Sequence, residues 1–223
     1  MCISSRHTSK LTRQYYRYAL NLKSLSYHTV YIKLPDVEAL AKKIGAAPTM
    51  TEPDGVSLFY MIPIIQDDST GTIISDSPTI VAYLDKTYPS SGPILIPTGM
   101  MTLQLAFSSA VVDAFTPLWP FYALGLMTKM NEVTAVYFLK GFKKLLIQVK
   151  ENLGKMNKWF EGSDGNFVIG NEPYFIDMAI CAFLWFTRGV VGEESEKWKD
   201  VVSWNAGRWR RYLESFKPYE KLL

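Results

Sequence analysis

The stretch Tyr60–Pro89, YMIPIIQDDSTGTIISDSPTIVAYLDKTYP, contains two residue patterns that could bind a ligand. The first is Pro63, which lies between Ile62 and Ile64 in an apolar run that predicts a strand. Proline has no amide donor, so a proline at this point indicates either an edge strand or a cis peptide bond. A cis bond would leave neighbouring backbone groups available to a ligand.

The second pattern is Asp76-Ser77-Pro78, which predicts the start of a helix. Ser77 suits the N-cap and Pro78 the first helical position. Helix N-termini attract carboxylates and phosphates, because free N–H groups and the positive end of the helix dipole meet there. Capping alone would also explain Ser77, and binding would be added to that role. With Ile62 and Pro63 nearby, the sequence predicts one shared ligand site.

These patterns lie in a chain of ordinary globular composition. Its 223 residues suit one large or two small domains, and a net charge of +3 is too small to predict nucleic-acid binding. Residues 1–35 carry six basic and no acidic side chains, which fits a basic first helix and strand or an organelle transit peptide. The continuation RYALNLKSLSYHTVYIKL has the pattern of structured chain and favours the first interpretation.

Other features favour a reducing cytoplasmic location and no membrane span. Cys2 and Cys181 are too few and too far apart in sequence for a disulfide framework, and Cys181 lies in an apolar run typical of an inert core. The apolar region 103–127 contains one Asp and two Pro, so it predicts buried helix. His7 and His28 have no metal-binding spacing, and no metal site is expected.

The hydrophobic periodicity predicts a small α/β domain over residues 1–89 and an all-helical domain over residues 99–223. The connector Pro89–Pro97, PSSGPILIP, separates them. The expected elements of the first domain are a short strand near 2–4, helix 14–22, strand 27–33, helix 37–44, strands 59–65 and 72–75, and helix 78–88. The second domain is expected to hold helices from 103 onward and at 132–159, 175–188 and 205–216.

Several strings in this order resemble the cytosolic glutathione transferase superfamily, over nearly the whole chain. The strings are IPIIQDD, ISDSPTIVAYLD and FVIGNEPYFIDMAICAFLWF, and three others, RYALNLK, PDVEALAKKIGAAP and EKWKDVVSWNAGRWRRYL, look most like fungal members. The resemblance implies a thioredoxin-like first domain with a first strand that looks truncated, followed by an all-α domain. It also implies a homodimer.

The resemblance assigns ligand contacts to three residues of the predicted site and a structural role to a fourth residue elsewhere. The backbone of Ile62, before Pro63, would pair with the cysteinyl part of glutathione, and Asp76 and Ser77 would hold its γ-glutamyl end. Asp177 corresponds to the family's buried helix cap, a structural role that fits a carboxylate at the start of an apolar helix.

The residue that would activate the glutathione thiol is the weakest match to the family. The family supplies Tyr, Ser or Cys between its first strand and first helix, and here this region contains Ser9, which could equally be a loop or capping residue. Aromatic and Met residues suit either helix core or a pocket for a small hydrophobic electrophile: Phe115, Trp119, Phe121, Tyr122 and Met127. The sequence thus predicts a detoxifying transferase or, alternatively, a non-catalytic binding or regulatory scaffold of the same fold.

Overall fold

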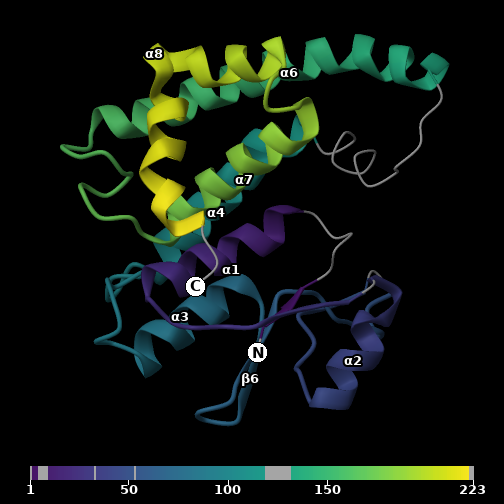
Figure 1. Cartoon of the computed structure of the whole chain (residues 1–223), viewed down its shortest axis with the longest axis vertical. Helices are drawn as coiled ribbons and strands as arrows, with labels where there is room; N and C mark the ends of the chain where they lie inside the picture. Colours follow the sequence, from purple (N-terminus) through teal and green to yellow (C-terminus); the bar gives the residue numbers. More distant parts are fainter. Residues whose placement is uncertain (1, 5–9, 33, 53, 119–131, 221–223) are drawn as a thin grey trace. The chain divides into compact units, whose positions relative to one another are not determined.

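The computed structural model describes residues 2–4, 10–32, 34–52, 54–118 and 132–220 (Figure 1). The chain divides into two compact units, Met1–Pro97 with Pro218–Leu223, and Thr98–Lys217. The tail returns to the first unit, where the Nδ2 of Asn21 donates a hydrogen bond of 2.5 Å to the Tyr219 carbonyl. Each unit is described separately below.

The first unit is built on a four-stranded sheet in the order β2-β1-β5-β6. Its strands are β1 (Cys2–Ser4), β2 (Thr29–Tyr31), β5 (Ile64–Asp67) and β6 (Thr72–Ser75). β1 runs parallel to β2 and antiparallel to β5, and β5 is antiparallel to β6. The first strand predicted near residues 2–4 is therefore present, three residues long, at the centre of the sheet.

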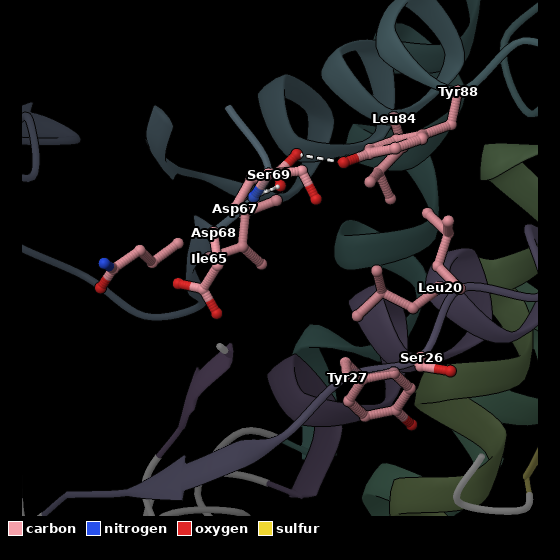
Figure 2. Close-up of a pocket in the computed structure, with 11 residues that line it drawn as sticks. Leu20, Ser26, Tyr27, Ile65, Asp67, Asp68, Ser69, Leu84 and Tyr88 are labelled. Atoms are coloured by element: carbon pink, nitrogen blue, oxygen red, sulfur yellow. Dashed lines mark hydrogen bonds between the residues drawn. The ribbon is translucent and has the colours of Figure 1, made fainter. Parts of the chain in front are cut away.

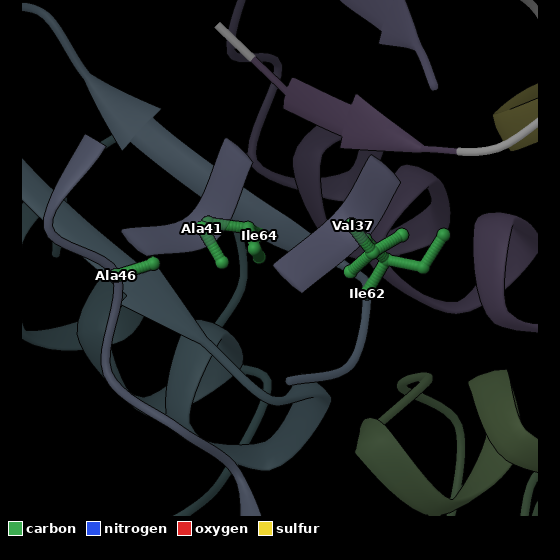
Figure 3. Close-up of a cluster of buried hydrophobic side chains, with 5 residues drawn as sticks. All are labelled: Val37, Ala41, Ala46, Ile62 and Ile64. Carbon is green, nitrogen blue, oxygen red and sulfur yellow. The ribbon is translucent and has the colours of Figure 1, made fainter. Parts of the chain in front are cut away.

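Three helices accompany this sheet: α1 (Lys10–Leu22), α2 (Val37–Ile44), which follows the short 3-10 turn η1 (Leu34–Asp36), and α3 (Ser77–Thr87). α2 ends where predicted, at Gly45, whose φ of 80° lies in the left-handed region that glycine tolerates. The buried residues of α2 pack on Ile62 and Ile64 at the start of β5 (Figure 3). Side chains alternate along a strand, so Ile65 points to the opposite face, where Leu20 of α1 and Leu84 of α3 are also buried.

The single strand predicted over residues 59–65 is wrong, because this stretch belongs to two different sheets. Phe59 ends β4 (Leu58–Phe59), which forms a two-stranded sheet with β3 (Met50–Thr51), whereas β5 begins only at Ile64. Pro63 cannot donate to a ladder, so the chain leaves one sheet before it enters the other.

The second unit is helical in the part that the structure describes. Its elements are α4 (Met101–Phe115), the 3-10 turn η2 (Thr116–Leu118), α6 (Glu132–Glu161), α7 (Phe175–Val191) and α8 (Glu196–Phe216), after which η3 (Lys217–Glu220) leads into the tail. The N-terminal half of α7 is buried on all sides, with no side chain from Ile176 to Leu184 more than 3% exposed. Phe115 of α4 stacks on Phe183 of α7, with ring centroids 5.0 Å apart. Among the described helices, none has the length and hydropathy needed to cross a membrane.

α8 begins nine residues earlier than the predicted helix at 205–216 and is broken inside. Asn205, Ala206 and Gly207 have positive φ angles, so the chain turns here and then resumes its helix. The Asn205 carboxamide holds the turn by accepting a hydrogen bond of 2.8 Å from Nε1 of Trp209. The sequence pattern captured only the second of the two helical segments.

Candidate functional site

The pairing of β5 with β6 brings the two predicted ligand-binding patterns to the same end of the sheet. Ile64, the first residue of β5, pairs with Ser75, the last residue of β6, so the chain enters β5 and leaves β6 at the same end of the sheet. Ile62 and Ser77 each lie two residues beyond that pair. Neighbouring strands lie about 5 Å apart, so both patterns can contact one small molecule at this end.

Ile62 and Pro63 form the first side of the candidate site. The peptide bond between them is cis, and both side chains are buried. The Ile62 side chain packs with Val37 and Ala41 of α2, which fixes the backbone beside it. Among the residues that the structure describes, none forms a backbone hydrogen bond with Ile62. Its N–H and C=O are thus available to an extended peptide.

Asp76 and Ser77 form the second side of the site, and the helix cap differs from the predicted one by a residue. Asp76, rather than Ser77, occupies the N-cap position, and its φ of 74° turns the chain sharply between β6 and α3. The Asp76 carboxylate accepts a hydrogen bond of 3.2 Å from the Thr79 hydroxyl instead of capping a backbone N–H. Ser77 therefore opens the first turn of α3.

Ser77 is half-buried, and among the residues that the structure describes its hydroxyl has no hydrogen-bond partner. Its backbone N–H is one of the unsatisfied donors at the start of α3, where the helix dipole is positive. A carboxylate at this position would accept from both groups, while the neighbouring Asp76 would attract an ammonium group.

The predicted thiol-activating residue, Ser9, lies outside the described residues. The same holds for four of the five residues suggested for a hydrophobic pocket: Trp119, Phe121, Tyr122 and Met127. The fifth, Phe115, is fully buried as helix core. Within the described ranges, no group of three or more His, Cys, Asp or Glu side chains could hold a metal ion.

Asp177 is fully buried in the second unit, where its carboxylate binds backbone N–H groups. Its carboxylate accepts hydrogen bonds from the N–H of Tyr174 at 2.8 Å, from the N–H of Val168 at 2.9 Å, and from the Tyr212 hydroxyl. Burial raises the pKa of Asp177 to about 6, although these hydrogen bonds act in the opposite direction. The carboxylate thus joins the start of α7 to the preceding loop and to α8.

Two polar networks in the first unit were not predicted from the sequence. Lys23 is fully buried and pairs with Asp85 at 2.8 Å, and the hydroxyls of Tyr83 and Tyr88 both donate to Asp67. Only Lys23 has a local signal, because it follows Tyr16 and Ala19 at helical spacing and so continues the buried face of α1 one residue beyond the end of the helix. Its partner, 62 positions away, had none.

Comparison with known proteins agrees with the fold. The model of the glutathione S-transferase C-terminal domain matches residues 143–219. A comparison with curated proteins finds no match. Among solved structures, a glutathione S-transferase of Ceriporiopsis subvermispora in complex with glutathione is 28% identical. The match covers 100% of this chain and 98% of that chain, with a TM-score of 0.85.

Two glutathione transferases of Phanerochaete chrysosporium are similarly related. GSTFuA2 is 28% identical, with a TM-score of 0.84 and coverage of 99% of this chain and 98% of that chain. GSTFuA3 is 27% identical, with a TM-score of 0.83 and coverage of 99% and 97% respectively. The thioredoxin-like sheet order, the helical second unit and these full-length matches agree. These findings support a member of the glutathione transferase superfamily that is similar to the fungal glutathione transferases.

Proposed function

We propose that the protein binds glutathione where β5 begins and α3 starts, and transfers it to small hydrophobic electrophiles. One observation carries the proposal. The pairing register of β5 and β6 brings the Ile62 backbone and the Ser77 hydroxyl to the same end of these two strands. The similar protein from Ceriporiopsis subvermispora was crystallised with glutathione, which supports the identity of the ligand.

The chemistry of glutathione matches the groups available at this edge. The γ-glutamyl carboxylate would accept from the Ser77 hydroxyl and N–H, and its ammonium would lie by the Asp76 carboxylate. The Ile62 N–H and C=O would pair with the extended backbone around the cysteine. Charge-assisted hydrogen bonds of this kind are the stronger class, so the γ-glutamyl end would supply much of the affinity.

The proposed reaction is a nucleophilic substitution. The glutathione thiol loses its proton, the thiolate sulfur bonds to the electrophilic carbon, and the leaving group departs with its electron pair; with a chlorinated nitrobenzene that group is chloride. Ser9 is the proposed hydrogen-bond donor to the thiolate. Such a donor favours the thiolate by lowering the pKa of the thiol.

We expect Ser77→Ala to weaken glutathione binding about tenfold, since a hydrogen bond to a charged group is lost while α3 keeps its other contacts. Isothermal titration with glutathione measures this change. Ser203→Ala is the matched control, because its hydroxyl bonds only the Asp200 carbonyl in the second unit. If Ser77→Ala and wild type bind glutathione with equal affinity, the proposed contact of Ser77 with the γ-glutamyl carboxylate is wrong.

Turnover separates the transferase from the alternative, a non-catalytic binding scaffold. Conjugation of glutathione to a chlorinated nitrobenzene, followed by absorbance, supports the transferase. Binding with no conjugation supports the scaffold, and failure to bind immobilised glutathione argues against both glutathione-dependent roles. If Ser9→Ala retains full activity, Ser9 is not the thiol activator.

A cytoplasmic homodimer completes the proposal. α4 exposes Leu105 and Val112, which are 41% and 42% accessible and, seven residues apart, lie on the same face of the helix. We expect a dimer in sedimentation velocity at micromolar concentration, and Leu105→Glu with Val112→Glu should shift the protein toward monomer. A wild-type monomer at this concentration would contradict the proposed assembly.

A further inference from the structure

The first unit contains a pocket of about 220 Å³ that the proposed glutathione site does not use. Figure 2 shows Tyr27 and Ser26, from the segment between α1 and β2, on one side of it, and Asp67, Ser69 and Tyr88 on the other. Leu20, Ile65 and Leu84 add an apolar wall and are at most 6% exposed. The pocket thus combines buried hydrocarbon and aromatic surface with an acidic edge.

The acidic edge is held in place by a hydrogen-bond network. The Asp67 carboxylate accepts hydrogen bonds from the Tyr88 hydroxyl at 2.5 Å and from the N–H of Ser69 at 2.9 Å (Figure 2). It also accepts one from the Tyr83 hydroxyl at 2.6 Å. Burial opposes ionisation, but these hydrogen bonds outweigh it and hold the pKa of Asp67 below its ordinary value. Asp67 is therefore charged at neutral pH, and Asp68 next to it adds a second carboxylate to the lining.

The pocket lies at the opposite ends of β5 and α3 from the glutathione site. Asp67 is five residues along the chain from Ile62, which corresponds to roughly 16 Å of strand. Tyr88 is eleven residues beyond Ser77, which is again about 16 Å of helix. A ligand in this pocket would leave the proposed glutathione site unoccupied.

We propose that this pocket binds a small organic cation with an aromatic body, such as a protonated arylalkylamine. The ammonium would lie by Asp67 and Asp68, and the ring would contact the three apolar side chains and the faces of the tyrosines. Among the residues that the structure describes, two cations bond to residues of the pocket lining, and both already have partners. Lys23 pairs with Asp85 and also donates to the Tyr88 carbonyl, and Nε of Arg17 donates to the Tyr27 hydroxyl on the far side of the pocket.

The volume supports a ligand with one ring. An apolar cavity of about 150 Å³ can hold benzene, whereas drug-sized ligands occupy about 300 Å³ or more. A pocket of about 220 Å³ falls between them. A phenyl ring with a short amine chain fills such a space, and its charged end reaches the carboxylates.

Titration of the ¹⁵N-labelled protein with 2-phenylethylamine tests the proposal. We expect amide shifts at Leu25, Ser26 and Ser69, with a Kd on the order of 1 mM for so small a ligand. The neutral analogue 2-phenylethanol should bind on the order of 16-fold more weakly, because it loses two ion pairs near 5 Å in water of about fourfold each. The anion 3-phenylpropionate should bind more weakly still. Binding of the alcohol as tight as that of the amine would overturn the cationic assignment.

Two variants locate the site. Asp68→Asn should lower the affinity for the amine about fourfold, with Asp164→Asn, an exposed acid of the second unit, as the control. Ser26→Trp should fill the pocket and abolish the shifts of all three ligands. Glutathione affinity should be unchanged in both variants, so this test stands apart from that of the proposed function. An Asp68→Asn protein that binds the amine like wild type would overturn the site, as would an absence of shifts at 10-fold the expected Kd.

Discussion

Asp177→Ala is expected to lower the free energy of unfolding by about 4 kcal/mol, because it leaves three donors without their acceptor. The N–H groups of Val168 and Tyr174 and the Tyr212 hydroxyl all donate to this carboxylate, and Asp177 and Tyr212 are at most 3% exposed. The loss is therefore larger than for an ordinary helix cap, which contributes about 1 kcal/mol.

Urea unfolding followed by tryptophan fluorescence measures this effect, because all six tryptophans belong to Thr98–Lys217 by sequence, the unit that contains Asp177. Glu196→Ala is the matched control: Glu196 is also an acid in the first turn of a helix, but its side chain is 86% exposed, and its pair with Lys199 is on the surface. We expect no measurable change there. Equal loss in the two variants would show that burial of Asp177 is irrelevant.

The raised pKa of Asp177 also predicts a pH dependence with a definite sign. Its pKa is about 6 in the folded protein and near 3.9 in an unfolded chain, so between these values the folded state holds the proton more tightly. This contribution to stability is fully present below pH 4 and is lost as the pH rises to 6, by up to roughly 1.4 kcal/mol per pH unit. Wild type should therefore lose stability across this window relative to Asp177→Asn, which does not titrate; parallel curves would contradict the raised pKa.

Lys23→Met is expected to destabilise the first unit by about 3 kcal/mol. The Lys23 ammonium is fully buried, bonds Asp85 at 2.8 Å and also donates to the Tyr88 carbonyl at 3.3 Å. Without it, the Asp85 carboxylate, whose side chain is only 15% exposed, loses its cationic partner. An uncompensated buried charge of this kind costs about 3–5 kcal/mol. The lower value applies here, because the N–H groups of Leu95 and Ile96 still donate to the Asp85 carboxylate.

Hydrogen exchange of the amides in α1 and α3 measures this loss, since the first unit contains no tryptophan. The double variant Lys23→Met with Asp85→Asn removes the stranded charge while it keeps an acceptor for Leu95 and Ile96, so it should be more stable than Lys23→Met alone. Lys42→Met, at an exposed pair with Glu38, should change little. If the double variant is no more stable than the single one, charge burial is not the cause of the loss.

The features that depend on neighbouring residues follow from the amino-acid sequence alone. The end of α2 at Gly45 follows from local backbone preferences, and β6 at Thr72–Ser75 follows from a short run of β-branched residues after a turn. So does the start of α3 beside Pro78, to within one residue. Each of these patterns spans only a few neighbouring residues, so it can be recognised in one amino-acid sequence. The family resemblance rests on the order of such local strings.

Contacts between residues that are far apart in the sequence depend on the tertiary structure. The register of Ile64 with Ser75 brings Ile62 and Ser77 to one edge, and the fold pairs Lys23 with Asp85 and closes the pocket beside Asp67. A lysine or a tyrosine has many possible partners in a chain of this length, and its own type does not select among them. That selection depends on the packing of helices and strands, which buries some groups together and leaves others in water.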